Sequence, residues 1–161
     1  MKQPKRPWAV VALSGIATIG SLTVSSPASA AAPLCQASQL RTTFVSGEGA
    51  AGHRYETWRM TNVGATCHTQ GWVGALNFGP DGRPLPTTVT RVQGPAPALT
   101  LASGKSADWI FGYGNPAILG CRGEVASAMI VTPPDNVSPL LVHPGEPACN
   151  GAVTATPLRA Q

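Results

Sequence analysis

The stretch HRYETWRMTNVGATCHTQGW, residues 53–72, decides the fold. Trp58 and Met60 alternate with polar residues in its first half, which is the period of a half-buried strand. Residues 62–64, Asn-Val-Gly, tolerate the backbone conformations of a tight turn. A return strand then ends at Trp72, a large side chain suited to a core. The stretch therefore predicts a β-hairpin at the centre of the domain.

Short strand patterns recur along the rest of the chain, separated by glycine and proline. They occupy residues 40–45, 73–78, 89–92, 99–101, 107–111, 125–131, 140–142 and 153–156. Residues 125–131 are almost continuously apolar, which predicts a strand buried on both faces. Three glycines in residues 46–52 predict a loop, as does the composition of 112–116, and residues 158–161 are expected to fray. The pattern predicts an all-β, immunoglobulin-like antiparallel β-sandwich of about seven to nine short strands.

The predicted core consists of the large apolar side chains of these strands. Its members are Leu40, Phe44, Trp58, Met60, Trp72, Leu76, Trp109, Phe111, Met129 and Val131. The aromatic residues Trp58, Trp72, Trp109, Tyr55 and Tyr113 could instead form a platform for a sugar or a peptide. Their strand positions favour the core for Trp58, Trp72 and Trp109. Tyr113 lies in a predicted loop and is expected to be exposed.

Residues 1–30 have the pattern of a signal peptide, and residues 31–161 would then form the single mature domain. Three basic residues precede an apolar run, and Ala28-Ser29-Ala30 fits a signal peptidase site. A membrane anchor is the alternative, but the apolar run is at the short end for a span. We therefore expect a secreted or cell-wall-associated protein that is not inserted in a membrane after cleavage.

The net charge of the mature chain argues against a nucleic-acid partner. The whole chain carries +4, but three of its eleven Lys and Arg residues lie in residues 1–30. The mature chain would then have eight basic and seven acidic residues, and the basic residues form no run. We expect a monomer whose partner is a cell-wall or extracellular ligand, and we expect no cofactor.

The four cysteines, Cys35, Cys67, Cys121 and Cys149, all follow the signal segment. An even number of cysteines in an exported chain indicates disulfides. Zinc is the competing interpretation, but there is no C-x-x-C pair, and His68 is adjacent to Cys67 rather than at ligand spacing. Of the three possible connectivities, we predict Cys35–Cys67 and Cys121–Cys149, because each bridge would tie one chain end to the body of the sandwich.

The order of several short motifs resembles a family of secreted actinobacterial domains known as domain of unknown function 4232. The motifs are Cys35 with Leu40, Gly49–Gly52, Thr61–Gly64 before Cys67, Gly71–Val73, Leu101 with Gly104, Ser106–Ala107, Cys121, and Cys149–Gly151. The chain departs from the family in having no lipobox, and in Ser103-Gly104 where Pro-Gly is common. The resemblance implies export and paired cysteines, and it transfers no catalytic residue.

The sequence favours a non-catalytic binding or structural domain. No G-x-S-x-G elbow is present, and three histidines and seven acidic residues are scattered along the chain. A small secreted hydrolase with an unrecognised site is the alternative. For a binding domain, the candidate loops are residues 46–53, 79–86, 112–120 and 133–139. We predict contact through Tyr113, Gly49 and His53.

Overall fold

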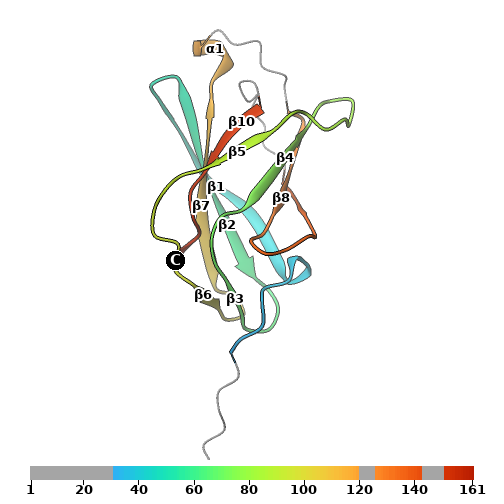
Figure 1. Cartoon of the computed structure of the whole chain (residues 1–161), viewed down its shortest axis with the longest axis vertical. Helices are drawn as coiled ribbons and strands as arrows, with labels where there is room; N and C mark the ends of the chain where they lie inside the picture. The colour runs from blue at the N-terminus through green and yellow to red at the C-terminus, as the bar shows by residue number, and fades with distance from the viewer. Residues whose placement is uncertain (1–30, 120–125, 143–150) are drawn as a thin grey trace, which may run out of the picture. The chain divides into compact units, whose positions relative to one another are not determined.

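The structure is a computed structural model that describes residues 31–119, 126–142 and 151–161. Within these ranges the chain forms eleven strands and two short helices (Figure 1). The strands are β1 (Leu40–Ala50), β2 (His53–Asn62), β3 (Cys67–Thr69), β4 (Gly74–Phe78), β5 (Thr88–Arg91), β6 (Leu99–Leu101), β7 (Ser106–Gly114), β8 (Ala128–Thr132), β9 (Leu140–Val142), β10 (Ala152–Ala155) and β11 (Arg159–Ala160). The helices are η1 (Ala37–Gln39) and α1 (Pro116–Leu119). The all-β prediction is confirmed, with more strands than expected. The predicted signal peptide, Cys121 and Cys149 lie outside the described residues.

The strands form three sheets. The main sheet has the order β1-β2-β7-β10-β5, with β11 also paired to β7. The second sheet pairs β3 with β6, and the third has the order β4-β8-β9. All of these pairs are antiparallel except β10 with β5, which is parallel. The strand predicted at residues 89–92 corresponds to β5, which lies at one edge of the main sheet.

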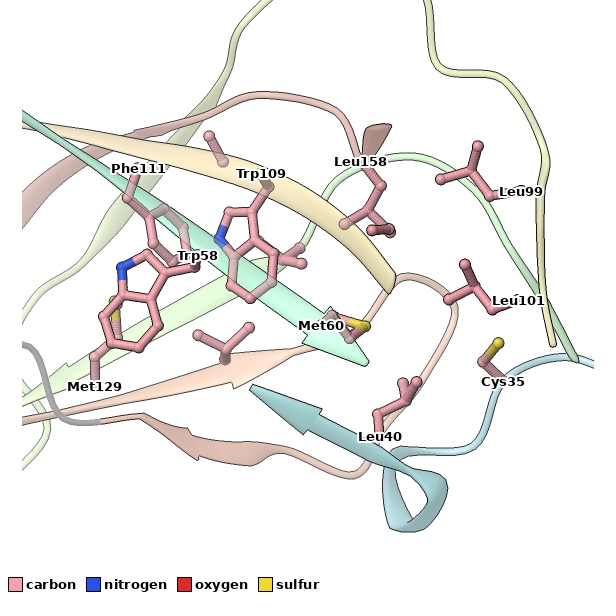
Figure 2. Close-up of a cluster of buried hydrophobic side chains, with 14 of the residues drawn as sticks. Cys35, Leu40, Trp58, Met60, Leu99, Leu101, Trp109, Phe111, Met129 and Leu158 are labelled. Carbon is pink, nitrogen blue, oxygen red and sulfur yellow. The ribbon is translucent and has the colours of Figure 1, made fainter. Parts of the chain in front are cut away.

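One hydrophobic cluster joins the main sheet to the third sheet. Side chains of β2, β7 and β10 pack in it with those of β8 (Figure 2). The rings of Trp109 and Phe111 meet edge to face, with their centroids 5.8 Å apart. Seven of the ten predicted core residues are buried: Leu40, Trp58, Met60, Trp109, Phe111, Met129 and Val131.

Three predicted core residues are not fully buried. Phe44 is 54% exposed because it lies in the edge strand β1, just before a bulge, although its ring still meets Trp58 edge to face. Leu76 is 39% exposed because its neighbour Asn77 takes the inward position of β4. Trp72 is half-buried, since it follows β3 at the rim of the core. Alternation identified the strand β4 but assigned its inward face to Leu76 instead of Asn77. A shift of one residue along a strand exchanges the two faces.

The predicted central hairpin is wrong in its pairing. β2 pairs with β1 and β7, whereas β3 pairs with β6. The buried Asn62 directs the chain from one sheet to the other. Its Nδ2 group donates to the carbonyl oxygens of Ala65 and Leu101, each at 2.8 Å, and its Oδ1 accepts from the N–H of Gly64 at 2.9 Å. These bonds satisfy polar groups of the turn and connect the end of β2 to β6.

Several predicted loops and ends are ordered strand. Residues 46–50 extend β1, and the hairpin to β2 turns at Ala51 and Gly52, both with positive φ. Pairing with β2 outweighs the low strand propensity of the glycines. Residues 159–160 form β11, so the predicted fraying is wrong. The strand predicted at 125–131 is β8, which alternates between buried and half-buried residues because only one of its faces meets the core.

Candidate functional site

Tyr113 does not lie in an exposed loop. It belongs to β7, is 6% exposed, and faces the interior. Its hydroxyl donates to Oε1 of Glu56 at 2.7 Å, and the indole N–H of Trp58 donates to Oε2 of Glu56 at 3.1 Å. The predicted exposure of Tyr113 is therefore wrong, because the two glycines beside it continue the strand instead of ending it. Tyr113 belongs to a buried hydrogen-bond network.

Glu56 is the charged residue of this network, and the sequence prediction overlooked it. It is 4% exposed, and a buried carboxylate requires donors that offset its lost hydration. The signal was present in the alternation of β2, which places Glu56 on the same face as Trp58 and Met60. The network stabilises the interior, and it is not an accessible binding site.

Gly49 and His53 lie near the turn between β1 and β2, and both are exposed. His53 stacks on Tyr55, with ring centroids 6.4 Å apart, and its Nδ1 lies 3.2 Å from the carbonyl oxygen of Ala51. The structure does not bring these two residues together with the buried side chain of Tyr113. The three predicted contact residues therefore do not form one surface.

A pocket of about 300 Å³ lies elsewhere, where three separate segments meet. It is lined by Gln70, Gly71, Trp72, Arg91, Ala96, Pro134 and Asp135. The first three follow β3, Arg91 ends β5, and the last two lie in the segment after β8. This segment belongs to the candidate loop 133–139. The sequence did not indicate that Arg91 would line a pocket, because its position depends on the pairing of β5 with β10.

Trp72 and Arg91 form one wall of this pocket. The guanidinium carbon of Arg91 lies over the indole ring, 5.6 Å from its centroid, which is a cation–π contact. The indole N–H donates to the carbonyl oxygen of Val92 at 3.1 Å, which fixes the plane of the ring. Nearby, Nε2 of Gln70 donates to the carbonyl oxygen of Ala96 at 2.7 Å. The polar groups of this wall are thus held in place without a ligand.

Asp135 also lines the pocket, in a constrained backbone conformation. Its φ is +55°, in the left-handed region that aspartate tolerates better than most residues. The N–H of Asn136 closes the turn by donating to the carbonyl oxygen of Pro133 at 3.2 Å. Nδ2 of Asn136 also donates to the carbonyl oxygen of Cys35 at 2.8 Å, and Oδ1 accepts from the N–H of Ala37 at 3.2 Å. The loop is therefore fastened to the N-terminal segment.

The Cys35–Cys67 disulfide, together with Asn136, links two of the segments that supply lining residues of the pocket. This predicted bridge is present, with an S–S distance of 2.05 Å. Cys35 holds the loop of Asp135 through Asn136, and Cys67 begins the strand that runs directly into Gln70. The predicted partner bridge, Cys121–Cys149, lies outside the described residues. One covalent link thus sets the relative positions of two of the three segments that form the pocket.

The charged pairs of the described residues lie away from this pocket. Arg59 and Asp108 face each other across β2 and β7 and form two hydrogen bonds of 2.9 Å. Because Arg59 donates these hydrogen bonds to the carboxylate of Asp108, the pKa of Arg59 is raised above its ordinary value, so this arginine stays charged. Arg83 pairs with Asp81 in the exposed turn after β4. Both pairs connect neighbouring parts of the surface.

The two described histidines contact backbone carbonyl groups. The ring of His53 contacts the carbonyl oxygen of Ala51, and the ring of His68 contacts that of Ala32. Within the described ranges no group of three or more His, Cys, Asp or Glu side chains could hold a metal ion. No helix in the described part of the chain is long and apolar enough to cross a membrane. His143 lies outside the described residues.

The fold and this pocket define an all-β domain with a disulfide at its base and a preformed polar pocket. The family model described as domain of unknown function (DUF4232) matches residues 35–159, so the chain belongs to that family. The resemblance seen in the order of its motifs is thereby confirmed. No curated protein and no solved structure matches the chain with significance.

Proposed function

We propose that this protein is an exported, non-catalytic domain that binds a small extracellular or cell-envelope ligand in the pocket between Trp72 and Asp135. The observation that carries this proposal is a pocket of about 300 Å³ in which Arg91 stacks on Trp72 and Gln70 is bonded to Ala96, with Asp135 on the same lining. This volume is at the lower end of the range for small-molecule sites. The contacts of Arg91 and Gln70 lower the entropy cost of binding, because these two side chains are already oriented when the ligand arrives.

The chemistry of the lining favours binding over catalysis. Among the described residues that line the pocket there is no serine, threonine, cysteine or histidine. Hydroxyl, thiol and imidazole groups are common nucleophiles and bases, and glycoside hydrolysis uses a pair of carboxylates. Asp135 is the single carboxylate of the described lining. The arrangement can hold and orient a ligand.

Export is supported by the signal-like pattern of residues 1–30 and by the Cys35–Cys67 bridge, because disulfides persist in oxidising compartments. We propose a monomer in the extracellular space or cell wall, without a nucleic-acid partner. N-terminal sequencing of the secreted protein tests this part of the proposal and should begin at Ala31. A sequence that begins at Met1 would refute it.

The binding role is tested with the purified chain immobilised and incubated with a cell-wall extract. Arg91→Ala should remove most of the retained material, since it takes away the main donor of the pocket. Arg83→Ala is the matched control, because Arg83 is an exposed arginine that does not line the pocket. Equal retention by both variants would refute the assignment of the site. Turnover of an ester, glycan or peptide that is lost with one histidine would refute the non-catalytic role.

A further inference from the structure

The charges of the Trp72–Asp135 pocket indicate the class of its ligand. Arg91 and Asp135 are the two charged residues of the described lining, and they carry opposite signs. Neither takes part in the ion pairs found among the described residues, which join Arg59 to Asp108 and Arg83 to Asp81. A ligand with one negative and one positive group would pair with both.

We propose that the pocket binds a small zwitterion, either a free amino acid or a short peptide with free ends. The ligand's carboxylate pairs with Arg91, and its ammonium group pairs with Asp135. This inference rests on the proposed function, and it adds the class of ligand to the site.

Arg91 is suited to the carboxylate. A guanidinium group presents its N–H donors in one plane, in a fork that matches the two oxygens of a carboxylate. Its contact with the Trp72 ring holds the guanidinium group in place. The ring is itself oriented, because the indole N–H donates to the carbonyl oxygen of Val92. The arginine is therefore oriented before the ligand arrives, so fewer rotamers have to be fixed on binding.

Asp135 is suited to the ammonium group. Its backbone is held by the turn that Asn136 fastens to Cys35, so the carboxylate does not depend on a flexible loop. Gln70 adds an acceptor on the same lining, because its Nε2 group is engaged with Ala96 while its Oε1 oxygen can accept a further bond. Three donors of an ammonium group would thus find acceptors from two side chains.

The size of the pocket limits the body of the ligand. Besides Gln70, the uncharged lining consists of the small residues Gly71, Ala96 and Pro134 and the flat ring of Trp72. A volume of about 300 Å³ suits one or two residues with short side chains. Alanine and dialanine are therefore the probes of choice.

The test is isothermal titration of the full chain with alanine, dialanine, N-acetyl-dialanine and dialanine amide. The last two lack the ammonium group and the carboxylate respectively. We expect alanine or dialanine to bind, and each blocked peptide to bind at least about tenfold more weakly than dialanine, as for the loss of one charged pair. Equal affinity for dialanine and both blocked forms would overturn the inference.

Two variants assign each charge to its partner. Asp135→Asn keeps the shape and tolerates the same backbone conformation, and it should remove the difference between dialanine and N-acetyl-dialanine. Arg91→Gln should remove the difference between dialanine and dialanine amide. Variants that leave both differences intact would overturn the inference.

The ligand class and the proposed function can fail separately. Suppose that neither alanine nor dialanine binds, but the wild type retains cell-wall material and Arg91→Ala does not. The assignment of a zwitterionic ligand is then wrong, and the assignment of the binding site is kept. If neither the probes nor the cell-wall material depends on Arg91, the proposed function is wrong as well.

Discussion

The replacement Tyr113→Phe removes one oxygen atom from the interior of the sandwich. The phenylalanine ring fills the same space in β7, and the hydrogen bond of 2.7 Å to Oε1 of Glu56 is lost. Glu56 is 4% exposed, so water cannot easily replace the missing donor. A hydrogen bond to a charged group contributes about 1.5–3 kcal/mol, and we expect the free energy of unfolding to fall by that amount.

The matched control is Tyr55→Phe, in the neighbouring strand β2. Tyr55 is 41% exposed, and its side chain lies over Gly112 on the opposite face from Tyr113. Because Tyr55 is exposed, its hydroxyl can be hydrated by solvent. We therefore expect the replacement to change the free energy of unfolding by no more than about 0.5 kcal/mol. The same chemical change is thus made on the two faces of one sheet.

Urea unfolding followed by tryptophan fluorescence measures both variants, with the disulfide kept oxidised. Thermal unfolding adds a second readout, at roughly 3–5 °C per kcal/mol for a domain of this size. If Tyr113→Phe and Tyr55→Phe are equally stable, the network around Glu56 does not contribute as argued. If Tyr113→Phe keeps its stability but loses ligand binding, the original expectation of an exposed contact residue would be restored.

Three further changes test the fold. Trp58→Ala should cost ~3–5 kcal/mol because a large buried side chain is removed, and a loss under about 1 kcal/mol in urea unfolding would contradict its place in the core. Replacing Cys35 and Cys67 by serine opens a loop with a sequence separation of 32 residues, which should cost ~3.5–4 kcal/mol by the loop-entropy estimate. Non-reducing peptide mapping of the wild type should recover this pair, and a peptide joining either cysteine to another partner would contradict it. Gly112→Ala would place a Cβ 2.6 Å from Oγ1 of Thr154, and we expect a loss of about 1–3 kcal/mol in thermal unfolding; an unchanged melting temperature would show that the strand can shift at no cost.

The fold class could be predicted because strand alternation is a local property. The pattern around Trp58 and Met60 identified β2 and its buried face, and the turn-rich composition identified an all-β domain. Pairing between strands depends on distant contacts that no local pattern records. Asn62 illustrates this limit: its side chain bonds to Leu101, a residue far along the chain, and so connects the end of β2 to β6, the strand that pairs with β3.

The candidate site was predicted less well, because a pocket is made by tertiary structure. Residues 133–139 were identified as a candidate loop from their prolines, and Pro134 and Asp135 do line the pocket. Trp72 was assigned to the core, and it serves both the core and the pocket. Arg91 ends β5 of the main sheet and Trp72 follows β3 of the second sheet, so their contact depends on tertiary packing that the sequence does not record.

The position of the last strands has a consequence for the order in which the chain can fold. β10 lies between β7 and β5 in the main sheet, and β11 adds to another part of β7. The sheet therefore remains incomplete until residues near the C-terminus are available, however early β1 and β2 form their hairpin. Pairs such as Val153 with Tyr113 close long loops, which slows folding. During synthesis from the N-terminus, β7 would lack its partners β10 and β11 until the chain had been made as far as Ala160. The domain would complete its fold only after that.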